Sequence, residues 1–393
     1  MQRRSFVAST AVFAAGLARL SSAQAAEAGV TDTEIVLGSS AVLSGPLGSQ
    51  IKVVHNGAAL AFDAVNEQGG VGGRKVKLVA LDDELKPEKA LENYGKLLND
   101  HRVFAFFGCV GSGTTAAAAK LLQQSGAPSV GGYGVGDGAR ERVAGSAYFV
   151  RASNAREAQA LVEHLATIGV NKIAIAHLDN PGGAEAVKLI EAAMVPHKLV
   201  PSAKVMAKGD GSDAAAAGKA LADSQSQAVL MYLAGTVAGE VIKGTYAAGS
   251  KPMFYGMSVV PGEITAKVVP LQAGGLAISQ VMPYPWGEVE TVTRDYRRLA
   301  ERAQVPVGYG SFEGYLNGLV MIEALKRTGR DLTRARLHAT LRALKLRLPA
   351  WTSISRPAPP PARASSKWCA SRPKAASCAE RAAGFAEQPA HAL

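Results

Sequence analysis

Two kinds of segment alternate along most of this 393-residue chain, and the alternation limits what it can fold into. Short apolar runs of β-type composition, such as 75–81 and 228–233, are each followed by a longer stretch whose apolar residues recur at helical spacing. The joints between them are short and rich in glycine. Strands that alternate with helices in this way form parallel sheets covered by helices. We therefore predict an α/β chain.

The alternation occurs in two successive series, which indicates two doubly wound parallel-sheet lobes. Strands are predicted over 34–40, 75–81, 103–107, 128–130, 172–176, 204–208, 228–233 and 252–255. Helices are predicted over 50–66, 87–98, 114–125, 155–168, 183–195, 214–222 and 237–248. Ligands of such sheets bind outside the carboxyl ends of the strands. Those ends are rich in Gly and Ser here, at 39–49, 108–115, 131–138 and 178–183. Small residues there let backbone N–H groups approach a ligand, which indicates a binding site.

The first 25 residues have the pattern of a cleaved export signal. Arg3 and Arg4 precede an apolar stretch too short to span a membrane, and Ala23-Gln24-Ala25 forms a cleavage site. We expect a mature chain that begins at Ala26 and is periplasmic and soluble. The paired arginines fit twin-arginine export, and an ordinary secretory signal fits equally well.

Charge and cysteine content argue against several classes of function. The net charge is +11, but residues 1–25 carry +3 and residues 349–393 carry +4, which leaves an ordinary +4 between them. We therefore expect no nucleic-acid partner. Only Cys109 lies before the tail, and the seven His are scattered, so we expect no metal and no cofactor. Hydrolase and P-loop motifs are missing, and we expect no enzyme.

Four segments resemble the type I periplasmic binding proteins of the leucine/isoleucine/valine family. They are LGSSAVLSGPLG (37–48), NGAALAFDAVNEQGGVGGRKVKLVALDDELKPEKA (56–90), GCVGSGTTAAAAKLLQQSGAPSVG (108–131) and GYLNGLVMIEALKRTGRDLTRARL (314–337). The resemblance implies a first lobe of 26–148 plus 281–348, a second lobe of 149–280, and a three-stranded hinge. It also implies a receptor that closes its lobes on an amino acid or a related carboxylate or amide. The implied partner is the inner-membrane permease of an ABC importer, and a freestanding ligand sensor is the alternative.

The resemblance also implies which residues bind the ligand. In the first lobe these are Ser44, Gly111, Ser112, Tyr133 and Gly134, and in the second they are Asp179, Met257 and Ser258. Ser112 matches the family's carboxylate-binding serine, although a plain helix cap explains it too. Tyr232 and Tyr255 are further candidates, although half-buried core positions explain them better. Trp286 fits a hinge wall or a ligand face, and a helix surface explains Glu313 and Tyr315 equally well.

One departure from the family pattern bears on the ligand. The acid that would pair with an α-ammonium should follow the strand at 252–255, and Gly256-Met257-Ser258 stands there instead. A buried ammonium without a partner is costly, so a standard α-amino acid is in doubt. Asp179 is a candidate substitute, and a solvated loop position is the simpler interpretation of it.

The composition changes abruptly after Leu348. Residues 349–393 are rich in Pro, Ala, Ser and Arg and have no regular period. A disordered tail explains them. We favour a frameshift, because one shift of reading frame yields alternating, strand-like sequence in two places.

Overall fold

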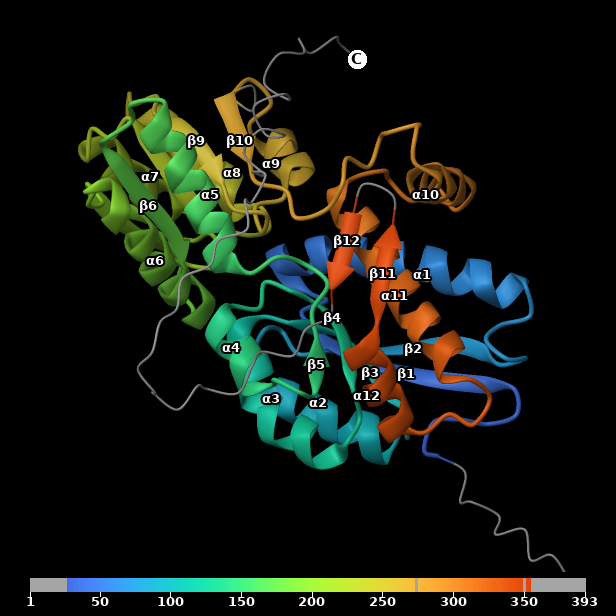
Figure 1. Ribbon diagram of the computed structural model, residues 1–393. Helices are drawn as coiled ribbons and strands as arrows, with labels where there is room; N and C mark the ends of the chain where they lie inside the picture. The colour runs from blue at the N-terminus through green and yellow to red at the C-terminus, as the bar shows by residue number, and fades with distance from the viewer. Residues whose placement is uncertain (1–26, 273–274, 349–350, 355–393) are drawn as a thin grey trace, which may run out of the picture.

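Two parallel β-sheets with helices on both faces form the body of the molecule (Figure 1). The computed structural model describes residues 27–272, 275–348 and 351–354. The expected export signal and all of the atypical tail except 351–354 lie outside the described residues, so both predictions stay predictions. Within the described ranges, no helix is long and apolar enough to cross a membrane.

The first sheet has five parallel strands in the order β2-β1-β3-β4-β5. They are β1 (Glu34–Ala41), β2 (Lys75–Asp82), β3 (Ala105–Val110), β4 (Ser129–Tyr133) and β5 (Ala147–Tyr148). The helices between them are α1 (Gly45–Glu67), α2 (Pro87–Asn99), α3 (Ser112–Ser125) and α4 (Asp137–Arg142). Leu97 of α2 and Leu122 of α3 pack with Phe106 of β3, while Phe62 of α1 packs with Phe107 on the opposite face. The sheet is therefore buried on both sides, as a parallel sheet requires.

The second sheet repeats this arrangement with the order β10-β9-β8-β6-β7, again all parallel. Its strands are β6 (Ile173–Leu178), β7 (Ala203–Ala207), β8 (Ala228–Tyr232), β9 (Met253–Gly256) and β10 (Leu276–Ile278). Its helices are α5 (Asn154–Thr167), α6 (Pro181–Met194), α7 (Ala214–Asp223), α8 (Val237–Ala247) and α9 (Gly262–Val268), with a short 3₁₀ turn, η1 (Val195–His197), after α6. Below we call the two sheets with their helices the first and second lobes.

The chain then returns to the first lobe. Its last elements are α10 (Thr291–Arg302), α11 (Tyr309–Thr328), α12 (Arg334–Ala343), β11 (Lys345–Leu348) and β12 (Trp351–Ile354). Glycines bring α11 against α1: a Cβ at Gly57 would lie 1.8 Å from the Ser311 carbonyl oxygen, and one at Gly314 would lie 1.8 Å from that of Val54. Strands β11 and β12 pair only with each other in the described sheets, as an antiparallel hairpin.

The α/β class and the two parallel sheets are confirmed, and the differences from prediction are local. The strand predicted at 128–130 extends to Tyr133 as β4, because Gly131-Gly132 continues the strand; a Cβ at Gly132 would lie 2.6 Å from the Phe149 ring. The short elements α4, β5 and β10 carry too few residues to show a period. The three-stranded hinge stays a prediction.

Candidate ligand-binding site

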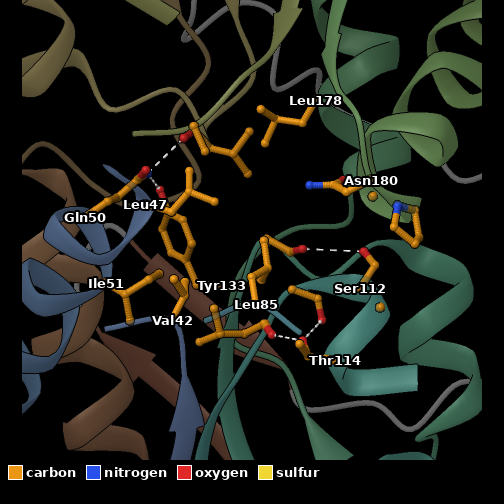
Figure 2. Close-up of a pocket in the computed structure, with 18 of the residues that line it drawn as sticks. Val42, Leu47, Gln50, Ile51, Leu85, Ser112, Thr114, Tyr133, Leu178 and Asn180 are labelled. Carbon is orange, nitrogen blue, oxygen red and sulfur yellow. Dashed lines mark hydrogen bonds between the residues drawn. The ribbon is translucent and has the colours of Figure 1, made fainter. Parts of the chain in front are cut away.

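A cavity lies between the lobes, at the carboxyl ends of β3, β4, β6 and β8 (Figure 2). We call it the central pocket. Its volume is about 80 Å³. Aliphatic side chains, including Val42, Leu47 and Ile51, line one side, and Ser112 and Asn180 lie opposite them. The remaining polar side chains are those of Gln50, Thr114, Tyr133 and Tyr232. The pocket therefore fits a small, mainly aliphatic molecule.

Helix α3 of the first lobe points its N-terminus into the central pocket. Gly111 precedes it with φ +78°, a conformation that favours glycine, and no side chain caps its first turn. The Thr114 hydroxyl donates back to the Gly111 carbonyl, at 3.0 Å, and to that of Val110. The Ser112 Oγ accepts from the Gly136 N–H at 2.8 Å, and its hydroxyl donates to the Gly134 carbonyl at 3.5 Å, a long bond that a ligand oxygen can replace. The free N–H groups and this hydroxyl form a site that favours an anion.

Helix α6 of the second lobe brings a second N-terminus to the same pocket. Asn180 caps it by accepting from the Gly183 N–H at 2.8 Å, and Pro181 opens the helix. At Gly182 a Cβ would lie 3.1 Å from the Ser112 Oγ and 3.3 Å from the Tyr232 hydroxyl, so the two lobes meet closely here. Because both helix ends carry partial positive charge, their convergence also favours an anion.

Gln50 of α1 joins the two lobes at one wall of the pocket. Its Oε1 accepts from the Gly235 N–H at 2.9 Å, and its Nε2 donates to the Val259 carbonyl at 2.8 Å. The same amide donates to the Tyr133 hydroxyl (Figure 2). Sequence reasoning missed Gln50. A buried polar residue beside Ile51, on the apolar face of an amphipathic helix, is the signal that marks it.

All nineteen residues that line the central pocket are uncharged. Where the family's acid was expected, Met257 is fully buried in the second-lobe core. Ser258 is held by Glu157 of α5, which accepts from its N–H at 2.8 Å and from its hydroxyl at 2.9 Å. Burial raises the pKa of Tyr232 to about 12 and raises that of Tyr133 further, so neither hydroxyl ionises near neutral pH.

The predicted site residues are thus only partly brought together. Gly111, Ser112, Tyr133 and Gly134 line the central pocket, and so does Tyr232. Ser44 and Asp179 are exposed beside it, and Ser258, Trp286 and Glu313 line a different cavity. Tyr315 is buried in the first-lobe core, while Tyr255 contacts His164. Ligand contact by any of these residues stays a prediction.

A buried ion pair lies behind the pocket. Arg151, in the segment that joins β5 to α5, is 3.6 Å from Glu313 of α11, and both side chains are almost fully buried. The Arg151 guanidinium also lies 4.8 Å from the centre of the Tyr133 ring and donates to the Ser258 hydroxyl. Burial alone would lower the pKa of Arg151, but Glu313 and Glu157 raise it overall. The charges are therefore held beside the pocket and not in it.

Known proteins share both the sequence pattern and the fold. A Leu/Ile/Val-binding protein, BraC3, of Rhizobium johnstonii is 33% identical over 104 residues, which are 26% of this chain and 28% of that protein. The match thus spans under a third of that relative. The crystal structure of a substrate-binding periplasmic protein from Ralstonia solanacearum is 26% identical with a TM-score of 0.75, over 79% of this chain and 89% of that one.

A more distant structure shares the fold alone. It is a solute-binding protein of an ABC transporter from Rhodopseudomonas palustris in complex with 3,4-dihydroxybenzoic acid, 18% identical with a TM-score of 0.69, over 83% of this chain and 90% of that one. The model of the periplasmic binding protein family matches residues 34–361. Because this match covers most of the sequence, the chain belongs to the periplasmic binding proteins, a family that binds and does not catalyse.

Proposed function

We propose that this protein captures a small aliphatic carboxylate without an α-ammonium group in its central pocket and delivers it to the permease of an ABC importer. The single observation that carries the proposal is the pocket's electrostatic character. Two helix N-termini and the Ser112 hydroxyl face a cavity whose lining side chains carry no charge. In this assignment the carboxylate lies on the first turn of α3. The aliphatic body faces Val42, Leu47 and Ile51.

The uncharged walls work against an amino-acid zwitterion. An ammonium taken from water into this pocket would meet no carboxylate among the residues that line it, and a buried charge without a partner is strongly unfavourable. A carboxylate, in contrast, gains hydrogen bonds from backbone N–H groups. The pocket's small volume favours a small ligand.

A branched-chain amino acid is the second candidate. One relative is named for binding leucine, isoleucine and valine, whereas a protein of the same fold holds an aromatic acid without an amine. Glu157 lies behind Ser258, the neighbour of the wall residue Val259, and a shift of Ser258 would expose a carboxylate. Which of the two candidate ligands binds therefore depends on whether Ser258 stays in place.

A thermal-shift panel tests the proposal. A ligand that binds only the folded state stabilises it, by about 2.7 kcal/mol at a hundredfold excess over its dissociation constant. We expect branched aliphatic acids to raise the melting temperature and the corresponding primary amides to raise it less, because the amides lack the negative charge. Equal shifts from acids and amides would contradict a site built for an anion.

A further inference from the structure

A second cavity lies between the lobes, on the other side of Gln50 and Tyr133 from the central pocket. We call it the lateral pocket. Its volume is about 540 Å³, several times that of the central pocket. Its walls come from α9 and β10 of the second lobe, from residues 280–286 between β10 and α10, and from the start of α11. Neither the family match nor the proposed function assigns a ligand to it.

A buried acid lines the lateral pocket. Glu313 is 4% exposed, and its Oε1 has no hydrogen-bond partner among the described residues. Oε1 lies 3.6 Å from the Arg151 Nε, an ion-pair distance beyond hydrogen-bond range, and the Arg151 Nε and Nη1 also have no hydrogen-bond partner among the described residues. A buried acceptor of this kind is unfavourable unless a donor reaches it. Glu313 thus offers a hydrogen-bond site to whatever enters the pocket.

Aromatic rings form one side of the same pocket. The Trp286 ring meets that of Tyr309 edge-on, with centroids 5.5 Å apart, and is itself 37% exposed. Glu263 lies beside them, with its Oε1 3.3 Å from the Tyr309 N–H, which donates to it. The charged residues that line the pocket are Glu263, Glu313 and Lys267, a net charge of −1. Apolar side chains, among them Ile278 and Met282, make up much of the rest.

We propose that the lateral pocket is a second ligand site, for a primary organic amine with an aromatic or branched apolar body. The ammonium donates to the Glu313 Oε1 and is paired with its charge, as a buried cation requires. The Trp286 and Tyr309 rings face the cation and the body, an arrangement that stabilises organic cations. Because its walls belong to both lobes, an amine bound in the lateral pocket contacts both of them.

Calorimetric titration of the whole chain with three matched probes tests the site. The probes are phenethylamine, 2-phenylethanol and 3-phenylpropanoate, which carry a positive, a neutral and a negative head group on similar bodies. We expect the amine to bind about tenfold tighter than the alcohol, and the acid to bind weakest of the three. Equal affinities of the amine and the alcohol would overturn the proposal.

Variants place the amine in the lateral pocket. Trp286→Ala should weaken amine binding about tenfold, and Glu263→Gln, at an exposed rim position, about threefold. Glu313→Gln should reduce the amine affinity to that of the alcohol. Since this change also disturbs the buried pair with Arg151, Trp286→Ala decides the matter if Glu313→Gln does not fold.

Ser112→Ala separates the two pockets. It alters the central pocket and should leave amine affinity unchanged, while Trp286→Ala should leave the affinity for aliphatic acids unchanged. Loss of amine binding in Ser112→Ala, with Trp286→Ala unaffected, would place the amine in the central pocket and overturn the proposal. Failure of the acids to bind, with the amine results as expected, would count against the proposed function alone.

Discussion

The central and lateral pockets share one wall and differ in electrostatics. Gln50 and Tyr133 line both of them. On the central side the walls carry no charge and two helix N-termini point inward, whereas two carboxylates and one lysine line the lateral side. A partition of two side chains thus separates neighbouring cavities whose walls differ in charge, and we expect them to prefer ligands of opposite charge.

The placement of the buried acids explains this contrast. Glu157 is held behind Ser258 and also accepts from the Ser279 hydroxyl at 2.8 Å. Glu313 is paired with Arg151 and lines only the lateral pocket. Both acids therefore lie close to the central pocket without being part of its wall, as does Glu185 of α6, which accepts from the Gly138 N–H. Changes to these charges and to the partition should break the contrast in predictable ways.

The largest effect should come from Arg151→Met, which should lower the free energy of unfolding. This change leaves Glu313 and Glu157 buried without their main cation, and breaking such a pair costs about 3–5 kcal/mol of the free energy of unfolding. Urea unfolding measures the loss. Arg302→Met is the matched control, because Arg302 pairs with Glu67 on the surface and should contribute less than about 1 kcal/mol. A loss below about 1 kcal/mol in Arg151→Met would contradict the account of the buried charges.

Ser112→Ala should give the next largest effect, and only in the central pocket. A hydrogen bond to a charged ligand group contributes about 1.5–3 kcal/mol, so acid affinity should fall about tenfold to a hundredfold. Calorimetric titration with the acid found in the thermal-shift panel measures it. Ser212→Ala, at an exposed serine of the second lobe, serves as the control. An unchanged affinity would mean that Ser112 only shapes the loop through the Gly136 N–H.

Gln50→Glu should bring a negative charge into the wall of the central pocket. We expect acid affinity to fall about tenfold, because a carboxylate at this position repels the ligand's own carboxylate. Gln50→Met keeps the length of the side chain without the charge, and it measures the loss of the bonds to Gly235 and Val259 separately. Equal losses in the two variants would show that Gln50 acts by joining the lobes and not through charge.

The dependence of binding on pH should give the smallest effect and should differ between the pockets. The central pocket has only the two tyrosines to titrate, both with pKa values raised by burial, so acid affinity should stay constant from about pH 6 to 9. In the lateral pocket, burial raises the pKa of Glu313, although Arg151 and Arg140 oppose the rise and Glu157 adds to it.

The direction in which amine affinity changes with pH in the lateral pocket follows from the raised pKa of Glu313. The carboxylate form binds the amine, so amine affinity should weaken as pH falls through the pKa of Glu313. Glu263 and Lys267 also face the pocket, and Glu263→Gln tests whether the exposed acid causes the change. Calorimetric titration at several pH values measures acid affinity in the central pocket and amine affinity in the lateral pocket. A parallel change of the two affinities with pH would contradict separate sites.

The sequence was sufficient for the α/β class and the two parallel sheets, and four of the eight predicted ligand-binding residues line the central pocket. Period and composition predicted the strands and helices because parallel sheets bury long apolar runs. The Gly- and Ser-rich strand ends indicated where a site would lie, and the family resemblance supplied Gly111, Ser112, Tyr133 and Gly134, which line the cavity. Short elements such as β5 were missed since two residues carry no period.

The rest of the site depends on contacts between distant parts of the chain. Gln50 acquires its role from Gly235 and Val259, which lie 185 and 209 residues further along the chain. The pairing of Arg151 with Glu313 is equally remote, and nothing local in the sequence joins them. The lateral pocket could not be predicted for the same reason.

The measurement that tests the central claim most directly is a calorimetric comparison of valine with 2-hydroxyisovalerate. The two molecules share a branched skeleton and a carboxylate and differ in the ammonium alone. The uncharged walls of the central pocket predict that the hydroxy acid binds at least about tenfold tighter, because the ammonium finds no partner. Valine binding as tightly as the hydroxy acid, or tighter, would contradict the account and make Glu157, behind Ser258, the missing acid.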